Sequence, residues 1–94
     1  MAAEQLVMVE VLSSNNCSRC KKTKILVSEV IEELKNSNIC YREVDVVEEI
    51  DYAVKLGVTQ IPAIAINGEL LFVAPPPKTK LRDAIIKCLK RTIE

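Results

Sequence analysis

The fold of this 94-residue chain is decided by residues 5–20, whose sequence is QLVMVEVLSSNNCSRC. Residues 5–12 are rich in β-branched side chains and almost continuously apolar, which is typical of a strand covered on both faces. The cluster at 13–16 favours a turn. Two cysteines three residues apart follow that turn directly. The segment therefore predicts a buried strand, a turn, and a helix that opens with a pair of thiols.

A helix is expected from about Ser18 to Lys35, because apolar residues recur there at steps of three and four positions. Residues 39–44 predict a second strand. Asp45 followed by Glu48 resembles a capping box, which predicts a short helix that ends at Gly57. The inner stripe of this short helix is expected to contain Ile50, Val54 and Ala53.

Residues 63–66 and 69–73 predict two short antiparallel strands, because Asn67-Gly68 between them suits a two-residue type I′ hairpin. The prolines at 75–77 predict an extended spacer. A last helix is expected from about Lys78 to Thr92, with an apolar face that contains Leu81, Ile85, Cys88, Leu89 and Thr92.

The predicted order is β-α-β-α-β-β-α, in a single domain over residues 1–94. Helices between the first three strands imply parallel, right-handed crossovers, with an antiparallel hairpin at the edge. The expected fold is therefore of the α/β class, with a four-stranded mixed sheet flanked by helices.

The composition excludes several functions. Thirteen basic residues balance thirteen acidic ones, so no net field attracts nucleic acid or a membrane surface. The absence of histidine excludes Ser-His and Cys-His nucleophile pairs and any metal site that contains histidine. Three aromatic residues and two glycines are too few for a base-stacking surface or a phosphate-binding loop. With no apolar run near the roughly 18 residues of a membrane span and no signal-peptide pattern, a soluble cytoplasmic protein is expected.

The spacing of Cys17 and Cys20 suits dithiol exchange. The first amides of a helix have no backbone partner and lie at the positive end of its dipole, so they stabilise a thiolate at Cys17. Cys20, one turn further, is expected to be more buried and less ionised. An exposed attacking thiolate and a sheltered resolving thiol are what exchange chemistry requires.

The charge order of this helix is unusual. Basic residues crowd its start and acidic ones its end, against the preference of the helix dipole. The start carries Arg19, Lys21, Lys22 and Lys24, and the end carries Glu29, Glu32 and Glu33. These cations favour a thiolate at Cys17 and would attract an acidic partner. The alternative is a solvated lysine face with no role.

The other two cysteines leave further alternatives open. Structural zinc or an iron–sulfur cluster would need Cys40 and Cys88, but neither belongs to a second Cys-x-x-Cys pair. Cys88 is expected in the core. Cys40 alternates with Arg42 and Val44 and is expected to be partly exposed, which leaves a regulatory or dimer-forming role open.

These motifs together give a family resemblance. With Cys17-Ser18-Arg19-Cys20, the segment GVTQIPA at 57–63 and the Asn67-Gly68 hairpin, the chain resembles the thioredoxin superfamily. Within it, the chain resembles specifically the small archaeal thioredoxin- and glutaredoxin-like protein disulfide oxidoreductases, and the resemblance runs nearly end to end.

The resemblance implies that the Ile61–Pro62 bond is cis, that Pro62 packs against the disulfide, and that the backbone of Ile61 can pair with an extended substrate. The implied catalytic residues are Cys17, Cys20 and Pro62, and the implied substrate-binding residues are Ser18, Arg19 and Ile61. No metal or organic cofactor is expected. The expected partners are protein disulfides and a thioredoxin-reductase-like or small-dithiol electron donor, with no nucleic acid or membrane partner, and the chain is expected to be a monomer.

The chain also departs from its relatives. Asn16 replaces the tryptophan of thioredoxins, and Ser18-Arg19 replaces their Gly-Pro, which is expected to make the dithiol couple more oxidising. Glu10 is nearest in sequence to the buried aspartate of thioredoxins, but its register does not fit.

The predicted function is therefore thiol–disulfide exchange. Two alternatives stay open: a thioredoxin-fold module that docks a partner through its basic helix, and a copper or mercury carrier that uses Cys17 and Cys20.

Overall fold

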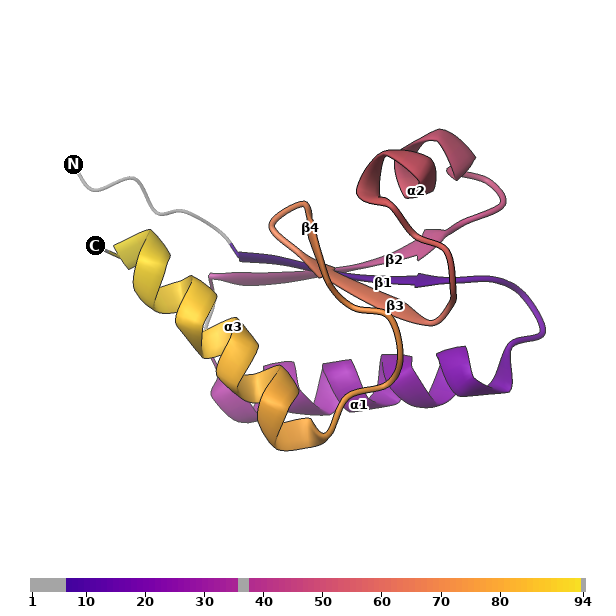
Figure 1. The fold of residues 1–94 in the computed structure, drawn as a ribbon. Coiled ribbons are helices and arrows are strands. Elements are labelled where there is room, and N and C mark those ends of the chain that lie inside the picture. The colour runs from indigo at the N-terminus through magenta and orange to yellow at the C-terminus, as the bar shows by residue number, and fades with distance from the viewer. Residues whose placement is uncertain (1–6, 36–37, 94) are drawn as a thin grey trace.

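The computed structural model describes residues 7–35 and 38–93, with side chains in the last helix described up to residue 89. The elements follow the predicted order (Figure 1). They are β1 (Val7–Ser13), α1 (Ser18–Leu34), β2 (Ile39–Asp45), α2 (Ile50–Leu56), β3 (Ala63–Ile66), β4 (Glu69–Phe72) and α3 (Lys78–Ile93). Among these residues, no helix is long and apolar enough to cross a membrane.

The four strands form one mixed sheet in the order β2-β1-β3-β4. Strand β1 is parallel to β2, whereas β3 is antiparallel to both β1 and β4. The prediction that the first three strands are parallel is therefore wrong for β3. A parallel β3 would require the chain to return along the whole of β2, about 23 Å for seven residues. Helix α2, also of seven residues, spans only about 10 Å and does not carry the chain back along β2. The chain therefore enters β3 at the end of the sheet where β2 finishes, and Ala63 and Val44 both lie beside Leu12.

Helices α1 and α3 cover one face of the sheet and α2 lies over the other (Figure 1). Alternation along β1 places Val7, Val9 and Val11 against the first face, where they pack with the apolar stripes of α1 and α3. The buried helical residues on this face are Val27, Val30, Leu81, Ile85, Cys88 and Leu89. The last four confirm the predicted apolar face of the final helix. The predicted position Thr92 lies outside the residues whose side chains are described.

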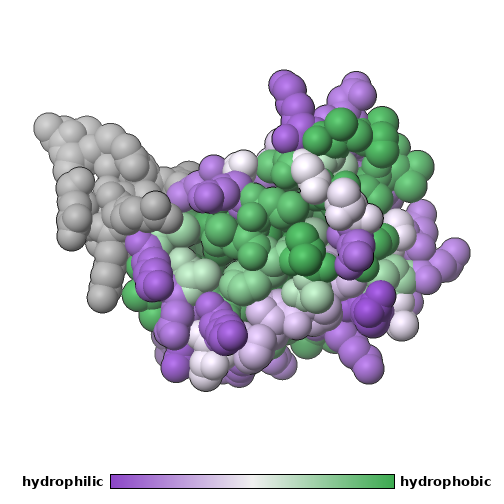
Figure 2. Space-filling model, viewed as in Figure 1, coloured by the Kyte–Doolittle hydropathy of each residue, from purple (hydrophilic) through white to green (hydrophobic). Residues whose placement is uncertain are grey.

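The predicted inner stripe of α2 is only partly correct. Ala53 is buried, but the side chains of Ile50 and Val54 are 55% and 68% exposed. The reason is that Asp45 caps a turn and not the helix: its Oδ1 accepts the amides of Val47 at 2.8 Å and Glu48 at 3.3 Å, and α2 begins later. So short a helix turns one narrow face inward, and Figure 2 shows apolar residues gathered on the surface over α2.

The predicted hairpin is confirmed. Asn67 and Gly68 have φ angles of 55° and 79°, which suit the type I′ turn between β3 and β4. Asn67 also fixes the hairpin to β1, because its Oδ1 accepts the amide of Met8 and its own amide donates to the carbonyl of Met8, both at 2.9 Å.

Candidate active site

The turn between β1 and α1 places Cys17 at the N-cap of the helix. Asn16 adopts a left-handed conformation with φ 64°, which asparagine tolerates better than most residues. Cys17 itself is extended, and its Sγ accepts a hydrogen bond from the amide of Cys20 at 3.1 Å. A sulfur that receives a helix amide is stabilised in its anionic form.

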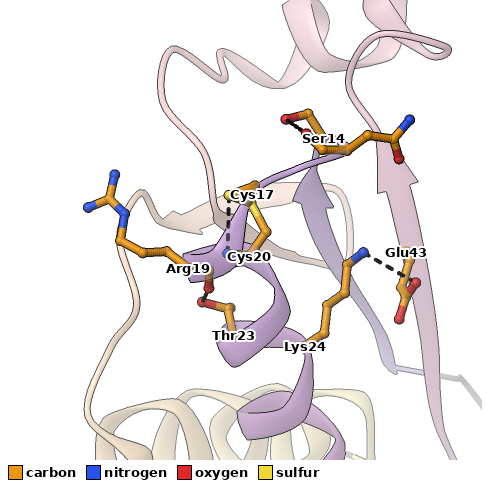
Figure 3. Close-up of a disulfide and its surroundings, with 8 residues drawn as sticks. Ser14, Cys17, Arg19, Cys20, Thr23, Lys24 and Glu43 are labelled. Carbon is orange, nitrogen blue, oxygen red and sulfur yellow. Dashed lines mark hydrogen bonds and ion pairs between the residues drawn. A yellow bond between two sulfur atoms is a disulfide. The ribbon is translucent and has the colours of Figure 1, made fainter.

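Cys17 and Cys20 form a disulfide, with their Cα atoms 5.2 Å apart (Figure 3). Their exposure differs as predicted: Cys17 is partly exposed, whereas Cys20 is 1% exposed. A partner molecule can therefore reach only one of the two sulfurs from solvent.

Exposed basic side chains surround this end of α1. Its first turn contains no acidic residue, and Arg19, Lys21 and Lys22 are all exposed. The side chain of Arg19 extends away from the two sulfurs (Figure 3). Lys24 is different, because its Nζ lies 3.6 Å from a carboxylate oxygen of Glu43. Of the four predicted basic residues, Lys24 is therefore paired, whereas the other three form no ion pair with any described residue.

The Ile61–Pro62 peptide is cis, as the resemblance implied. Pro62 is buried and Ile61 is partly exposed. Within the part of the chain that the structure describes, no backbone hydrogen bond involves the amide or carbonyl of Ile61. A groove of about 250 Å³ lies between α2 and this segment, lined in part by Ile50, Val54, Val58 and Ile61. The exposed side chains of α2 therefore lie beside a free stretch of backbone. The packing of Pro62 against the disulfide stays a prediction.

Glu10 is buried, yet it belongs to a different part of the molecule. Its carboxylate accepts a hydrogen bond from Nε of Arg42 at 3.0 Å and another from the hydroxyl of Tyr52. Arg42 lies 5.5 Å from the centre of the Tyr52 ring, and the hydrogen bonds to Glu10 raise the pKa of both Tyr52 and Arg42. The cluster lies on the α2 face of the sheet, whereas α1 lies on the other face.

Sequence reasoning missed this cluster. A signal was present, because a carboxylate within a buried strand requires a partner. The partners could not be chosen from the sequence, since Arg42 and Tyr52 are 32 and 42 residues from Glu10.

The remaining cysteines lie elsewhere. Cys40 is partly exposed on β2 and Cys88 is buried on α3, as predicted, and neither forms a disulfide within the described residues. No group of three cysteine or acidic side chains among the described residues is arranged to hold a metal ion. The four cysteines therefore do not form a single metal site.

A disulfide at the N-terminus of a helix, packed on a mixed sheet and accompanied by a cis-proline segment, defines a class: thiol–disulfide oxidoreductases with a thioredoxin fold. Residues 7–86 match the family model described as "Thioredoxin domain". The chain belongs to the thioredoxin family and is a thiol–disulfide oxidoreductase, with Cys17–Cys20 as its redox-active disulfide.

Archaeal proteins are among its relatives. The chain is 32% identical over 83 residues to a thioredoxin of Methanocaldococcus jannaschii, covering 88% of this chain and 96% of that protein. It is 30% identical over 82 residues to a probable thioredoxin of Archaeoglobus fulgidus, covering 87% and 89%. Among solved structures, a protein disulfide oxidoreductase from Aeropyrum pernix superposes with a TM-score of 0.81 at 27% identity. That match covers 96% of this chain but 40% of the other.

Proposed function

We propose that this protein reduces disulfides of other proteins, with Cys17 as the attacking thiolate and Cys20 as the resolving thiol. The observation that carries this assignment is the unequal exposure of the two sulfurs. Of the two cysteines, Cys17 is the one accessible to a substrate, and among the described residues a helix amide donates a hydrogen bond to its sulfur and not to that of Cys20.

The exchange has two steps. In the reduced protein, the Cys17 thiolate attacks one sulfur of the substrate disulfide, which breaks that bond, forms a mixed disulfide and releases the first substrate thiolate. Cys20 then loses its proton and attacks the Sγ of Cys17, which releases the second substrate thiolate and forms the Cys17–Cys20 disulfide. Two electrons pass to the substrate, and a thioredoxin-reductase-like protein or a small dithiol returns them to this chain.

The substrate is held mainly through its backbone. The free amide and carbonyl of Ile61 support pairing with an extended segment, and the adjacent groove offers apolar contact to its side chains. Ser18 and Arg19 lie between the two cysteines and contact the same segment in this proposal, while Pro62 shapes the opposite side of the site. The chemistry requires no metal or organic cofactor, and the chain acts as a cytoplasmic monomer.

Reduction of insulin with dithiothreitol as the electron source tests the assignment. Cys17→Ser is expected to abolish all turnover above the rate of dithiothreitol alone. Cys20→Ser is expected to accumulate a mixed disulfide with the substrate, visible on a non-reducing gel. Cys40→Ser, which removes another partly exposed thiol, is the matched control and is expected to turn over at the wild-type rate. If the wild type and Cys17→Ser both reduce insulin only at the rate of dithiothreitol alone, the result would instead favour a docking module without redox function.

A further inference from the structure

Three cations next to the disulfide have no partner of their own. We call Arg19, Lys21 and Lys22 the basic patch; all three are exposed on the first two turns of α1. No ion pair among residues 7–35 and 38–93 involves any of them. The helix gains nothing from these charges, because cations at its N-terminus oppose its dipole.

Nearby acidic groups do not neutralise the basic patch. Glu43 of β2 is paired with Lys24, and within the described residues no carboxylate forms an ion pair with Arg19, Lys21 or Lys22. The first turn of α1 contains no acidic residue. An approaching molecule therefore meets a positive surface at this end of the helix, although the whole chain has a net charge of zero.

The basic patch lies where it would contact the segment that flanks a substrate disulfide. Residues four apart share one side of a helix, so Lys21 lies one turn along α1 from Cys17, and Lys22 one turn from Ser18. One turn is about 5.4 Å, which is within the reach of a side chain adjacent to the cysteine under attack.

We propose that the basic patch selects substrates whose disulfide is flanked by acidic side chains. This inference rests on the proposed function and adds a substrate class to it. The occupant is an acidic protein segment, since charge complementarity acts at the same helix turns as the exchange chemistry. Attraction between exposed charges acts mainly on the rate of encounter and is screened by salt.

The test compares two disulfide-linked peptides that differ only in carrying Glu or Lys on both sides of each cysteine. The second-order rate constant for their reduction by the fully reduced protein is measured at low and high ionic strength. We expect the Glu peptide to react roughly ten-fold faster at low salt, and the difference to shrink as salt is added.

Two variants with the same change in net charge separate the basic patch from the charge of the whole chain. Lys21→Glu/Lys22→Glu is expected to remove or reverse the preference for the Glu peptide. This variant should fold, because acidic residues near a helix N-terminus are favourable. The control Lys80→Glu/Lys87→Glu changes two exposed lysines of α3, away from the N-terminal end of α1 (Figure 1), and is expected to keep the preference.

The outcomes are distinguishable. Equal rates for the two peptides with an active wild-type protein would overturn the inference and leave the proposed function standing. A preference that survives in Lys21→Glu/Lys22→Glu would also overturn it. If the wild type reduces neither peptide, the proposed function itself fails.

Discussion

The two halves of α1 carry opposite charges, and they differ in what those charges contact. In the second half, the carboxylate of Glu33 is hydrogen-bonded to Lys78 and lies 4.0 Å from Arg82, both on α3. In the first half, Arg19, Lys21 and Lys22 contact no acidic group among the described residues. The fold thus pairs one of the three acidic side chains of the second half, because no ion pair among the described residues involves Glu29 or Glu32. The basic patch is left for a partner, and it lies beside the disulfide.

This comparison predicts that a substitution which weakens the packing of α3 lowers the stability of the fold and leaves the redox properties of the disulfide unchanged. Leu81 is fully buried between α3 and the rest of the core. Leu81→Ala is expected to lower the free energy of unfolding by about 2–5 kcal/mol, because it removes apolar contacts and leaves a cavity. Urea unfolding measures the loss. The midpoint potential of the Cys17–Cys20 couple is expected to stay close to the wild-type value, and a large shift would mean that the two halves are not separable.

A smaller effect is expected from a substitution at the N-terminal end of α1, which carries the disulfide. Arg19→Gln removes one exposed cation near Cys17, and attraction between exposed opposite charges is worth about 0.2–1 kcal/mol. Since 1.4 kcal/mol corresponds to 30 mV, the midpoint potential should become more negative by roughly 5–20 mV. The matched control, Lys87→Gln, is expected to leave the potential where it is. If both variants shift the potential equally, net charge and not position is responsible.

The smallest effect is expected from the Glu33–Lys78 ion pair, at the C-terminal end of α1. The hydrogen bond from Lys78 lowers the pKa of Glu33, so the carboxylate stabilises the fold above its ordinary pKa and loses this contribution as the pH falls through the lowered value. Glu33→Gln is therefore expected to reduce stability slightly at neutral pH. Urea unfolding at neutral and at acid pH should show the difference from the wild type vanishing in acid. A difference that does not depend on pH would exclude this pair as its cause.

Much of this architecture could be predicted from local patterns. The periodicity of α1, the Asn67-Gly68 turn and the spacing of Cys17 and Cys20 each depend on residues close together in sequence, and the structure confirms them. The direction of β3 depends instead on how the length of α2 compares with that of β2. The exposure of Ile50 and Val54 also depends on α2, because this helix begins later than the position of Asp45 suggested.

The candidate site likewise has features that follow from nearby residues in the sequence and features that depend on distant ones. The difference between Cys17 and Cys20 followed from their positions in one helical turn. That Lys24 is paired, whereas Lys21 and Lys22 are not, depends on Glu43 of β2, which the sequence alone does not place beside α1.

Alkylation of the fully reduced protein across a pH series tests the central claim most directly, with each cysteine quantified by mass spectrometry. The account predicts that Cys17 reacts first, and already below pH 8.5, about where an ordinary thiol is half ionised. Cys20, buried behind it, should react later. If Cys20 reacts as early as Cys17, or if Cys17 reacts only where an ordinary thiol does, the assignment of attacking and resolving thiols is contradicted.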